Sequence, residues 1–251
     1  MSENRVNLDE IINTRYSRFL TYPSSEAEGE AKERVQQLKE IGISSLIFKG
    51  STSIDGVQVL GKGCVGIVAE GLLGKTLVAV KIRRLDADRA SLLDEARYLR
   101  LANSVDVGPA LITATQNMLV MQLVNGQPLF KWVERARRRA VIRSVLRQLL
   151  LDCFKLDAIG LDHGELSHAP RNVLVNPRNE PCIVDFESAS SSRRVANVTS
   201  LIQYFLFGQL ARSFGGRRLY HNQKTILHSL TLYKQDGSVS NFENILHLLR
   251  V

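Results

Sequence analysis

Residues 56–84 constrain the fold of this chain more than any other stretch, because three β-rich runs follow one another with only short turns between them. GVQVLGKG (56–63) alternates apolar and polar side chains, VGIVAEG (65–71) follows, and TLVAVKIRR (76–84) is rich in β-branched residues. Alternation with a period of two is typical of strands, and connections this short join antiparallel neighbours. The sequence therefore predicts an antiparallel sheet around a glycine-rich loop.

A helix is predicted next, over residues 87–102, because one face of it carries residues at helical spacing: Leu92, Glu95, Ala96 and Leu99. Two more strands, LITAT (111–115) and MLVMQLV (118–124), would form a hairpin. Residues 51–123 are thus expected to form one small domain with three strands, a helix and two strands.

The rest of the chain is predicted to be mostly helical. A helix over 130–159 would bury an apolar stripe formed by Ile142, Val145, Leu146, Leu149, Cys153 and Leu156. VLV (173–175) and CIV (182–184) are short apolar strands, and the chain from Val195 is again mostly helical. Residues 124–251 form this second part, and residues 1–50 are expected to be an appended helical extension. The predicted fold class is α+β.

The glycine-rich loop suggests a site for phosphates. Glycines at 61, 63 and 66 would let backbone N–H groups close over anionic oxygens, although the same pattern also suits a plain turn between two strands. Lys81 on the third strand would lie under this loop, where its ammonium could bridge two phosphates. A buried lysine needs a partner, and Glu95 is expected to provide it from the apolar face of the helix.

The order of these motifs resembles the protein-kinase-like fold. The glycine loop, VAVK, the helix glutamate, HGEL followed by NVLV, and VDFE occur in that order over about residues 56–210. The HG pair before the acid is similar to small atypical kinases, namely the RIO family and the Bud-type kinase of the tRNA-modifying KEOPS complex. The closest likeness is to predicted archaeal Ser/Thr kinases with HGEL and DFES motifs. The resemblance implies a bilobal fold with a small antiparallel-sheet N-lobe and a minimal, mostly helical C-lobe.

The resemblance also assigns roles to individual residues and implies ATP and Mg²⁺ as cofactors. It implies Glu165 as the catalytic acid, with Lys81 and Glu95 as the supporting ion pair. It implies Asp185 and Asn172 as metal ligands. The residues that it places against the nucleotide are Gly61, Gly63, Gly66, Val68, Ala79, Lys81, Met121, Gln122 and Leu123. Of these, Met121 would stand at the entrance of the adenine pocket, and Gln122, Leu123 and Val124 would be the hinge.

The sequence departs from the kinase pattern at three places. The catalytic acid is a glutamate, Glu165. The step from Glu165 to Asn172 is seven residues instead of five, so either the loop bulges or another group such as His168 binds the metal. Glu187 replaces the glycine of D-F-G, and no A-P-E motif follows. His163 is expected to be structural, bonding to backbone near Asp185.

Three functions are compatible with these motifs. The first is an ATP-dependent atypical Ser/Thr protein kinase, with ATP hydrolysis in the same site and an acceptor protein that the sequence does not name. The second is a small-molecule phosphotransferase, because antibiotic and choline kinases share the HG-acid pattern. The third is a nucleotide-binding pseudokinase that acts as a scaffold on RNA or a ribonucleoprotein.

The charge distribution bears on partners. The net charge is +8, and residues 126–251 account for all of it with 18 basic and 10 acidic side chains. Such a field favours a polyanion such as RNA. Two groups of arginines could contact phosphates: a helical stripe of Arg135, Arg139, Arg143 and Arg147, with a solvated helix face as the alternative, and Arg171, Arg193 and Arg194 near the expected substrate entrance.

The three cysteines lie far apart and form no C-x-x-C pair, which argues against disulfides or a zinc site. No apolar run reaches the length that spans a bilayer. We therefore expect a protein of the reducing cytoplasm without a membrane partner.

Overall fold

The computed structural model describes residues 4–24, 26–168, 171–207 and 222–251, with the side chains of His168 and Phe207 excepted. The chain is α+β, which confirms the predicted class. It divides into two compact units: unit 1 comprises Met1–Arg97 and Ala110–Leu123, and unit 2 comprises Tyr98–Pro109 and Val124–Val251. Helix α3 (Leu93–Asn103) begins in unit 1 and ends in unit 2.

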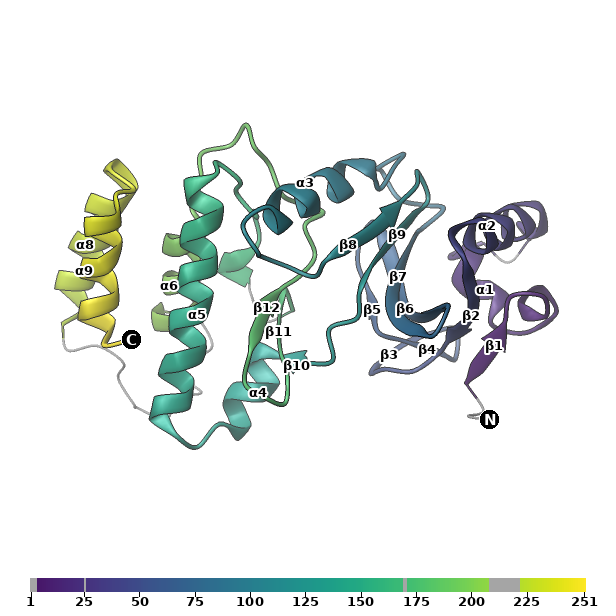
Figure 1. Ribbon diagram of the computed structural model, residues 1–251, viewed down its shortest axis with the longest axis horizontal. Coiled ribbons are helices and arrows are strands. Elements are labelled where there is room, and N and C mark those ends of the chain that lie inside the picture. The colour runs from purple at the N-terminus through teal and green to yellow at the C-terminus, as the bar shows by residue number, and fades with distance from the viewer. Residues whose placement is uncertain (1–3, 25, 169–170, 208–221) are drawn as a thin grey trace. The chain divides into compact units, whose positions relative to one another are not determined.

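Unit 1 is built on a seven-stranded antiparallel sheet with the strand order β1-β2-β6-β7-β9-β8, in which β5 also pairs with β6 (Figure 1). A separate hairpin of β3 (Thr52–Ile54) and β4 (Val57–Val59) precedes β5. The strands of the sheet are β1 (Arg5–Asn7), β2 (Ile43–Ile47), β5 (Gly61–Lys62), β6 (Gly66–Leu73), β7 (Thr76–Arg83), β8 (Leu111–Ala114) and β9 (Met118–Gln122).

Residues 1–50 contain the helices that the sequence predicts, but they do not form a separate appended element. They contain the helices η1 (Ile11–Asn13), α1 (Ser17–Thr21) and α2 (Glu28–Ile41), but they also add β1 and β2 to the main sheet. Their buried side chains, including Phe19 and Leu38, share one core with Val80 of β7. β1 has only three residues, so its sequence carries no periodic signal, and its pairing with β2 decides its structure.

Helix α2 ends at a glycine. Gly42 adopts a left-handed backbone with φ +95°, and its N–H donates to the carbonyls of Leu38 and Lys39. Glycine reaches this conformation without strain and is the usual residue just after a helix.

Unit 2 is mostly helical and contains one small antiparallel sheet with the order β10-β11-β12. The predicted apolar stripe is buried along α5, which lies beside this sheet in Figure 1. The elements of unit 2 are α4 (Leu129–Arg135), α5 (Arg139–Ala158), η2 (Leu166–His168), α6 (Asn197–Phe207), α8 (Gln223–Gln235) and α9 (Val239–Leu249), with β10 (Gln127–Pro128), β11 (Val173–Val175) and β12 (Pro181–Ile183).

The single helix predicted over 130–159 is wrong, because the chain breaks between α4 and α5. Ala136 and Arg138 have ψ angles of 116° and 119°, which are not helical. The break falls within the run RARRR, and α5 begins at its last arginine, Arg139. The basic stripe is therefore not continuous: Arg135 ends α4, whereas its other three members lie on α5.

Candidate functional site

Lys81 and Glu95 form a buried ion pair in unit 1. The Lys81 Nζ lies 2.9 Å from Glu95 Oε1 and 2.8 Å from Oε2, and the two side chains are 3% and 4% exposed. Lys81 comes from β7, and Glu95 comes from the first turn of α3, where the neighbouring Asp94 is exposed instead. Charges buried this deeply are stable only when paired. The pair therefore fixes the lysine ammonium at one place on the sheet.

Val68, Ala79 and Met121 share the face of the sheet that carries Lys81. Val68 pairs with Lys81, and Ala79 pairs with Met121 and precedes Lys81 by two residues. Directly paired residues of neighbouring strands project from the same face, as do alternate residues of one strand. The intervening residues, such as Val80, enter the core that α1 and α2 cover. The sheet thus gathers these predicted nucleotide-contacting residues on the face opposite that core.

The glycine-rich segment is a tight hairpin between β5 and β6. Gly61 pairs with Val68, and the Gly63 N–H donates to the Gly66 carbonyl at 2.8 Å. A Cβ on Gly66 would lie 2.9 Å from both Cγ and Cε of Lys81. Glycine at this position therefore lets the β6 backbone lie against the lysine stem, and a side chain there would displace the ammonium.

Arg84 holds the tip of this hairpin. Its Nη1 donates to the Gly63 carbonyl at 2.9 Å, and its backbone N–H donates to the Val65 carbonyl at 2.8 Å. The Arg84 guanidinium lies 5.3 Å from the centroid of the Tyr22 ring, and the Lys62 Nζ lies 4.2 Å from it. The N-terminal segment thus contacts the glycine-rich hairpin. The sequence offered one signal for this role, which is the position of Arg84 just after VAVK.

The predicted hinge residues differ in what their backbones can offer. The Gln122 N–H donates to the Ala110 carbonyl at 2.8 Å, so the sheet already uses it. Within the described part of the chain, the Leu123 backbone makes no hydrogen bond outside the strand ladders. Leu123 is therefore the residue whose N–H and carbonyl remain available to a ligand.

Glu165 of unit 2 accepts a hydrogen bond on each carboxylate oxygen. Asn172 Nδ2 donates to Oε2 at 2.9 Å, and Ser188 Oγ donates to Oε1 at 2.5 Å. The seven-residue step therefore does not separate Glu165 from Asn172, because the short helix η2 takes up part of the longer loop. Ser188 is an additional site residue, and its only sequence signal is its place directly after VDFE.

Asp185 has a left-handed backbone with φ +68°, which is uncommon for a residue with a side chain. Both backbone groups of Val184, the residue before Asp185, are hydrogen-bonded. The Val184 N–H donates to the Asn172 carbonyl at 2.9 Å, and the Val184 carbonyl accepts from His163 Nε2 at 3.1 Å. Strained backbone that its surroundings hold in place is concentrated at functional sites. This backbone is compatible with the predicted role of Asp185 but does not by itself identify a site, because positive φ angles also occur at Asp55, Asp106, Asn179 and Arg250.

His163 has the structural role that the sequence predicts. Its side chain is fully buried, and its ring centroid lies 4.9 Å from that of Phe186. Its backbone N–H donates to Asn197 Oδ1 at 2.8 Å. Burial lowers the pKa of His163, so the imidazole is neutral and Nε2 carries the proton that Val184 accepts. The histidine positions the backbone just before Asp185.

Gly164 of HGEL makes room for an arginine from a later segment. Its φ is +88°, and a Cβ there would lie 2.4 Å from Arg193 Nη2 and 2.6 Å from the Ser188 carbonyl oxygen. The Arg193 Nε donates to Asp162 at 2.5 Å, and Nη2 donates to the Ser188 carbonyl at 3.0 Å. Arg193 is therefore tied to the segment that carries Glu165, which differs from the phosphate contact expected from the sequence.

The structure also places Glu187 and Arg194, two further residues that the sequence analysis singled out. Glu187 is buried, with 7% of its surface exposed. Arg194 donates to the Lys234 carbonyl, so its guanidinium also has a partner within unit 2. The side chain of His168, the alternative metal ligand, lies outside the described residues.

No protein-family model matches the sequence, and no curated protein matches it. In the described part of the chain, no helix is sufficiently long and apolar to cross a bilayer.

Proposed function

We propose that this chain is an ATP- and Mg²⁺-dependent phosphotransferase of the atypical protein-kinase-like class, which transfers the γ-phosphoryl group to a serine or threonine hydroxyl of a protein. Unit 1 would correspond to the small lobe and unit 2 to the helical lobe of that fold. The observation that carries the proposal is the buried Lys81–Glu95 pair, packed against the glycine-rich hairpin at Gly66.

Unit 1 supplies groups suited to a nucleotide. The Lys81 ammonium, held by Glu95, is a fixed positive charge for phosphate oxygens. The face around it is apolar at Val68 and Ala79, which suits the flat surface of a purine, and the Leu123 backbone is available to bond its edge. This combination of one fixed cation, an apolar face and a free backbone edge supports nucleotide binding over a plain structural turn.

Magnesium fits the oxygen donors of unit 2. Asn172 donates its Nδ2 to Glu165, and its side-chain carbonyl oxygen accepts no hydrogen bond from the described residues. That oxygen and the Asp185 carboxylate are hard ligands of the kind that Mg²⁺ prefers. A bound magnesium ion would neutralise charge on the phosphate oxygens.

Glu165 is the residue proposed to orient the acceptor hydroxyl. Its two hydrogen bonds, from Asn172 and Ser188, fix the direction of the carboxylate, and each oxygen keeps a lone pair for a further donor. A positioned carboxylate acts as a general base when the acceptor hydroxyl lies within hydrogen-bond reach. The extra methylene of glutamate is thus compatible with this role.

Calorimetry with ATP and Mg²⁺ tests the nucleotide site. Lys81→Met should weaken binding at least tenfold, since it removes the fixed cation and leaves Glu95 without its ammonium partner, which corresponds to about 1.4 kcal/mol or more. Lys75→Met is the matched control, because it removes the same charge from an exposed turn and should change affinity less than about twofold. Equal affinities for Lys81→Met and the parent would contradict the proposal.

Single-turnover transfer from γ-labelled ATP, with and without protein acceptors, tests the reaction. Glu165→Gln should slow transfer by about ten- to a thousandfold while ATP affinity stays nearly unchanged, because Glu165 acts on the acceptor and not on the nucleotide. Tight ATP binding without transfer to protein or water would favour the pseudokinase scaffold, an alternative that the buried Glu187 supports. Transfer only to small molecules would favour the phosphotransferase alternative.

A further inference from the structure

Tyr22 lies at the point where the N-terminal segment meets the glycine-rich hairpin of unit 1. It follows directly after α1, and its side chain packs against the core that α1 and α2 cover. Its carbonyl accepts a hydrogen bond from the Leu85 N–H at 2.9 Å. The backbone of Tyr22 is therefore attached to the chain just after β7.

A buried arginine strengthens this attachment. Arg34 of α2 is 0% exposed, and its Nη1 donates to the Leu20 carbonyl at 2.7 Å and to the Arg83 carbonyl at 2.6 Å. Its Nε donates to Glu30 Oε1 at 2.7 Å. A buried charge is retained when it is paired and hydrogen-bonded in this way. One guanidinium thus joins the end of α1 to the end of β7, and Tyr22 stands on a rigid support.

The Tyr22 side chain contacts two cations of the hairpin. The Lys62 Nζ lies 4.2 Å from the centroid of the ring and donates to the hydroxyl at 2.5 Å. The Arg84 guanidinium lies 5.3 Å from the same centroid, and Asp86 orients it by accepting from Nε at 2.8 Å and from Nη2 at 2.6 Å. Cations within about 6 Å of an aromatic ring are attracted to its face. The ring is therefore a common support for both cations.

Both cations act on Gly63, the central glycine of the hairpin. Lys62 directly precedes Gly63, and Arg84 Nη1 donates to the Gly63 carbonyl at 2.9 Å. Lys62 pairs with Ile67, which is 1% exposed and belongs to the core of unit 1, so the lysine projects from the face of the sheet opposite Lys81. Lys62 is therefore an anchor of the hairpin and not a second phosphate ligand beside Lys81.

We propose that Tyr22 is a positioning residue for the nucleotide site: its ring holds the glycine-rich hairpin in the conformation that binds phosphates and so sets the affinity for ATP and Mg²⁺. The inference rests on the proposed phosphotransferase function. Apparent affinity falls with the fraction of molecules in the binding conformation. Loosening the hairpin therefore weakens binding although no group that contacts the nucleotide is removed.

Calorimetry with ATP and Mg²⁺, together with hydrogen exchange of the Gly63 amide in the absence of nucleotide, tests this role. Tyr22→Leu keeps an apolar contact with the core but removes the ring and the hydroxyl. It should weaken binding about three- to tenfold and speed exchange of the Gly63 N–H, which donates to the Gly66 carbonyl, by a similar factor. Tyr22→Phe keeps the ring and should stay within about twofold of the parent in both measurements.

Tyr16→Leu is the matched control, because it removes another aromatic ring from the same N-terminal segment. Tyr16 stacks on Phe48 with ring centroids 4.5 Å apart, inside the core and not on the hairpin. Tyr16→Leu should lower the melting temperature but leave ATP affinity and Gly63 exchange within about twofold of the parent.

Lys62→Met separates positioning from direct contact with phosphate. If Lys62 acts through Tyr22, its loss should weaken ATP binding about two- to fivefold in the parent and less than about twofold in Tyr22→Leu. Lys62 is exposed, so this variant keeps the test decisive if Tyr22→Leu fails to fold. It should also speed Gly63 exchange without nucleotide, which the loss of a phosphate ligand alone would not do.

The inference is overturned by parent-like affinity and exchange in Tyr22→Leu, by an equal loss of affinity in Tyr16→Leu, or by parent-like Gly63 exchange in Lys62→Met. Equal effects of Lys62→Met in the parent and in Tyr22→Leu would overturn it as well. In each of these cases, ATP binding by the parent leaves the proposed function standing. A parent that does not bind ATP and Mg²⁺ would instead overturn the proposed function, and this inference with it.

Discussion

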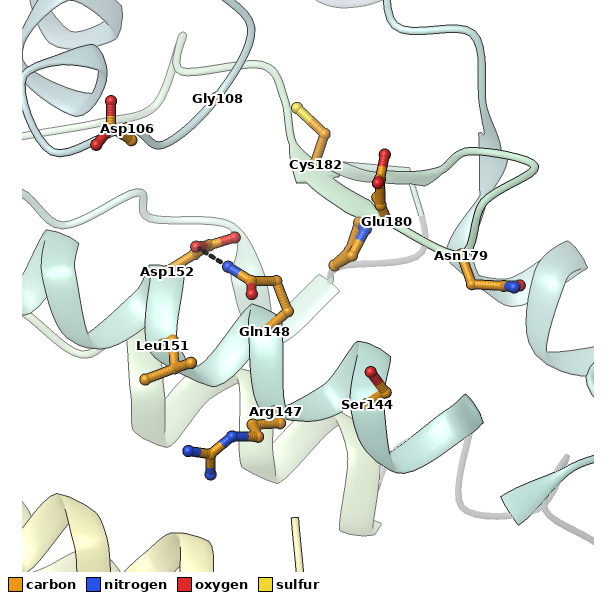
Figure 2. A pocket seen from close by; sticks show the side chains of 11 residues that line it. Asp106, Gly108, Ser144, Arg147, Gln148, Leu151, Asp152, Asn179, Glu180 and Cys182 are labelled. Carbon is orange, nitrogen blue, oxygen red and sulfur yellow. Dashed lines mark hydrogen bonds between the residues drawn. The ribbon is translucent and has the colours of Figure 1, made fainter. Parts of the chain in front are cut away.

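Asp152 should cost this protein stability at neutral pH, and replacing it with asparagine should recover that stability. Asp152 lies on α5 with 6% of its surface exposed, and its carboxylate accepts a hydrogen bond from Gln148 (Figure 2). The nearby Lys155 favours the charged form but does not outweigh burial. Burial raises the pKa of Asp152 from 3.8 to about 6, because desolvation disfavours the charged form. Asp152→Asn keeps the shape and an oxygen that Gln148 can still bond, but it removes the buried charge.

The sign and size of the effect follow from the two pKa values. The native state holds the Asp152 proton between pH 3.8 and about 6, where the unfolded chain has lost it, so stability falls as the pH rises through this window. Each pKa unit is worth about 1.4 kcal/mol, which gives a maximum cost of about 3 kcal/mol above pH 7. At pH 4 the advantage of the Asp152→Asn variant should be less than about 1 kcal/mol.

Urea unfolding of the parent and of Asp152→Asn between pH 4 and pH 8 measures this difference. The free energy of unfolding of the variant should exceed that of the parent by an amount that grows with pH and levels off near pH 7. Glu243→Gln, on the exposed face of α9, should differ from the parent by less than about 0.5 kcal/mol throughout. A variant less stable than the parent at pH 8, or a difference independent of pH, would refute the argument from burial.

Two further predictions concern packing around the candidate site. Lys81→Met should lower the free energy of unfolding by about 3–5 kcal/mol, because it leaves Glu95 buried without its cation. In urea titrations, the double variant Lys81→Met with Glu95→Leu should recover most of that loss. A double variant no more stable than the single one would contradict the pairing argument. Gly164→Ala should be destabilised by more than 2 kcal/mol, since its Cβ would meet Arg193 Nη2 at 2.4 Å. Gly160 has a φ of +72° and no atom within 4 Å of an added Cβ, so Gly160→Ala should lower the free energy of unfolding by only about 1 kcal/mol. Equal losses for Gly160→Ala and Gly164→Ala would show that backbone strain alone, and not the contact with Arg193, causes the effect.

Much of the sheet of unit 1 could be predicted from the sequence. The runs around the glycine-rich hairpin alternate with the period of a strand, and they form β6 and β7 with Lys81 and Val68 as direct partners. The helical spacing of Glu95, Ala96 and Leu99 placed all three on the buried face of α3, and Leu92, just before the helix, is buried beside them. These features are local, because a strand or helix fixes the direction of a side chain from a few neighbours.

Parts of the candidate site could not be read from motifs. Ser188 bonds to Glu165 across 23 residues, and Arg193 fills the space above Gly164 from 29 residues away. Neither contact leaves a periodic trace, since each depends on where two loops meet. The seven-residue step from Glu165 to Asn172 suggested that they might separate, yet the loop brings them within 2.9 Å.

The sequence by itself determined the α+β class, the strand and helix that carry Lys81 and Glu95, and the buried stripe of α5, because hydrophobic periodicity encodes which face of an element leaves water. Only the tertiary structure decided that β1 and β2 join the main sheet, that the chain breaks between α4 and α5, and that Asp152 faces a cavity. Strand pairing and burial depend on residues that are distant in sequence, and their free energies arise only once the chain has folded.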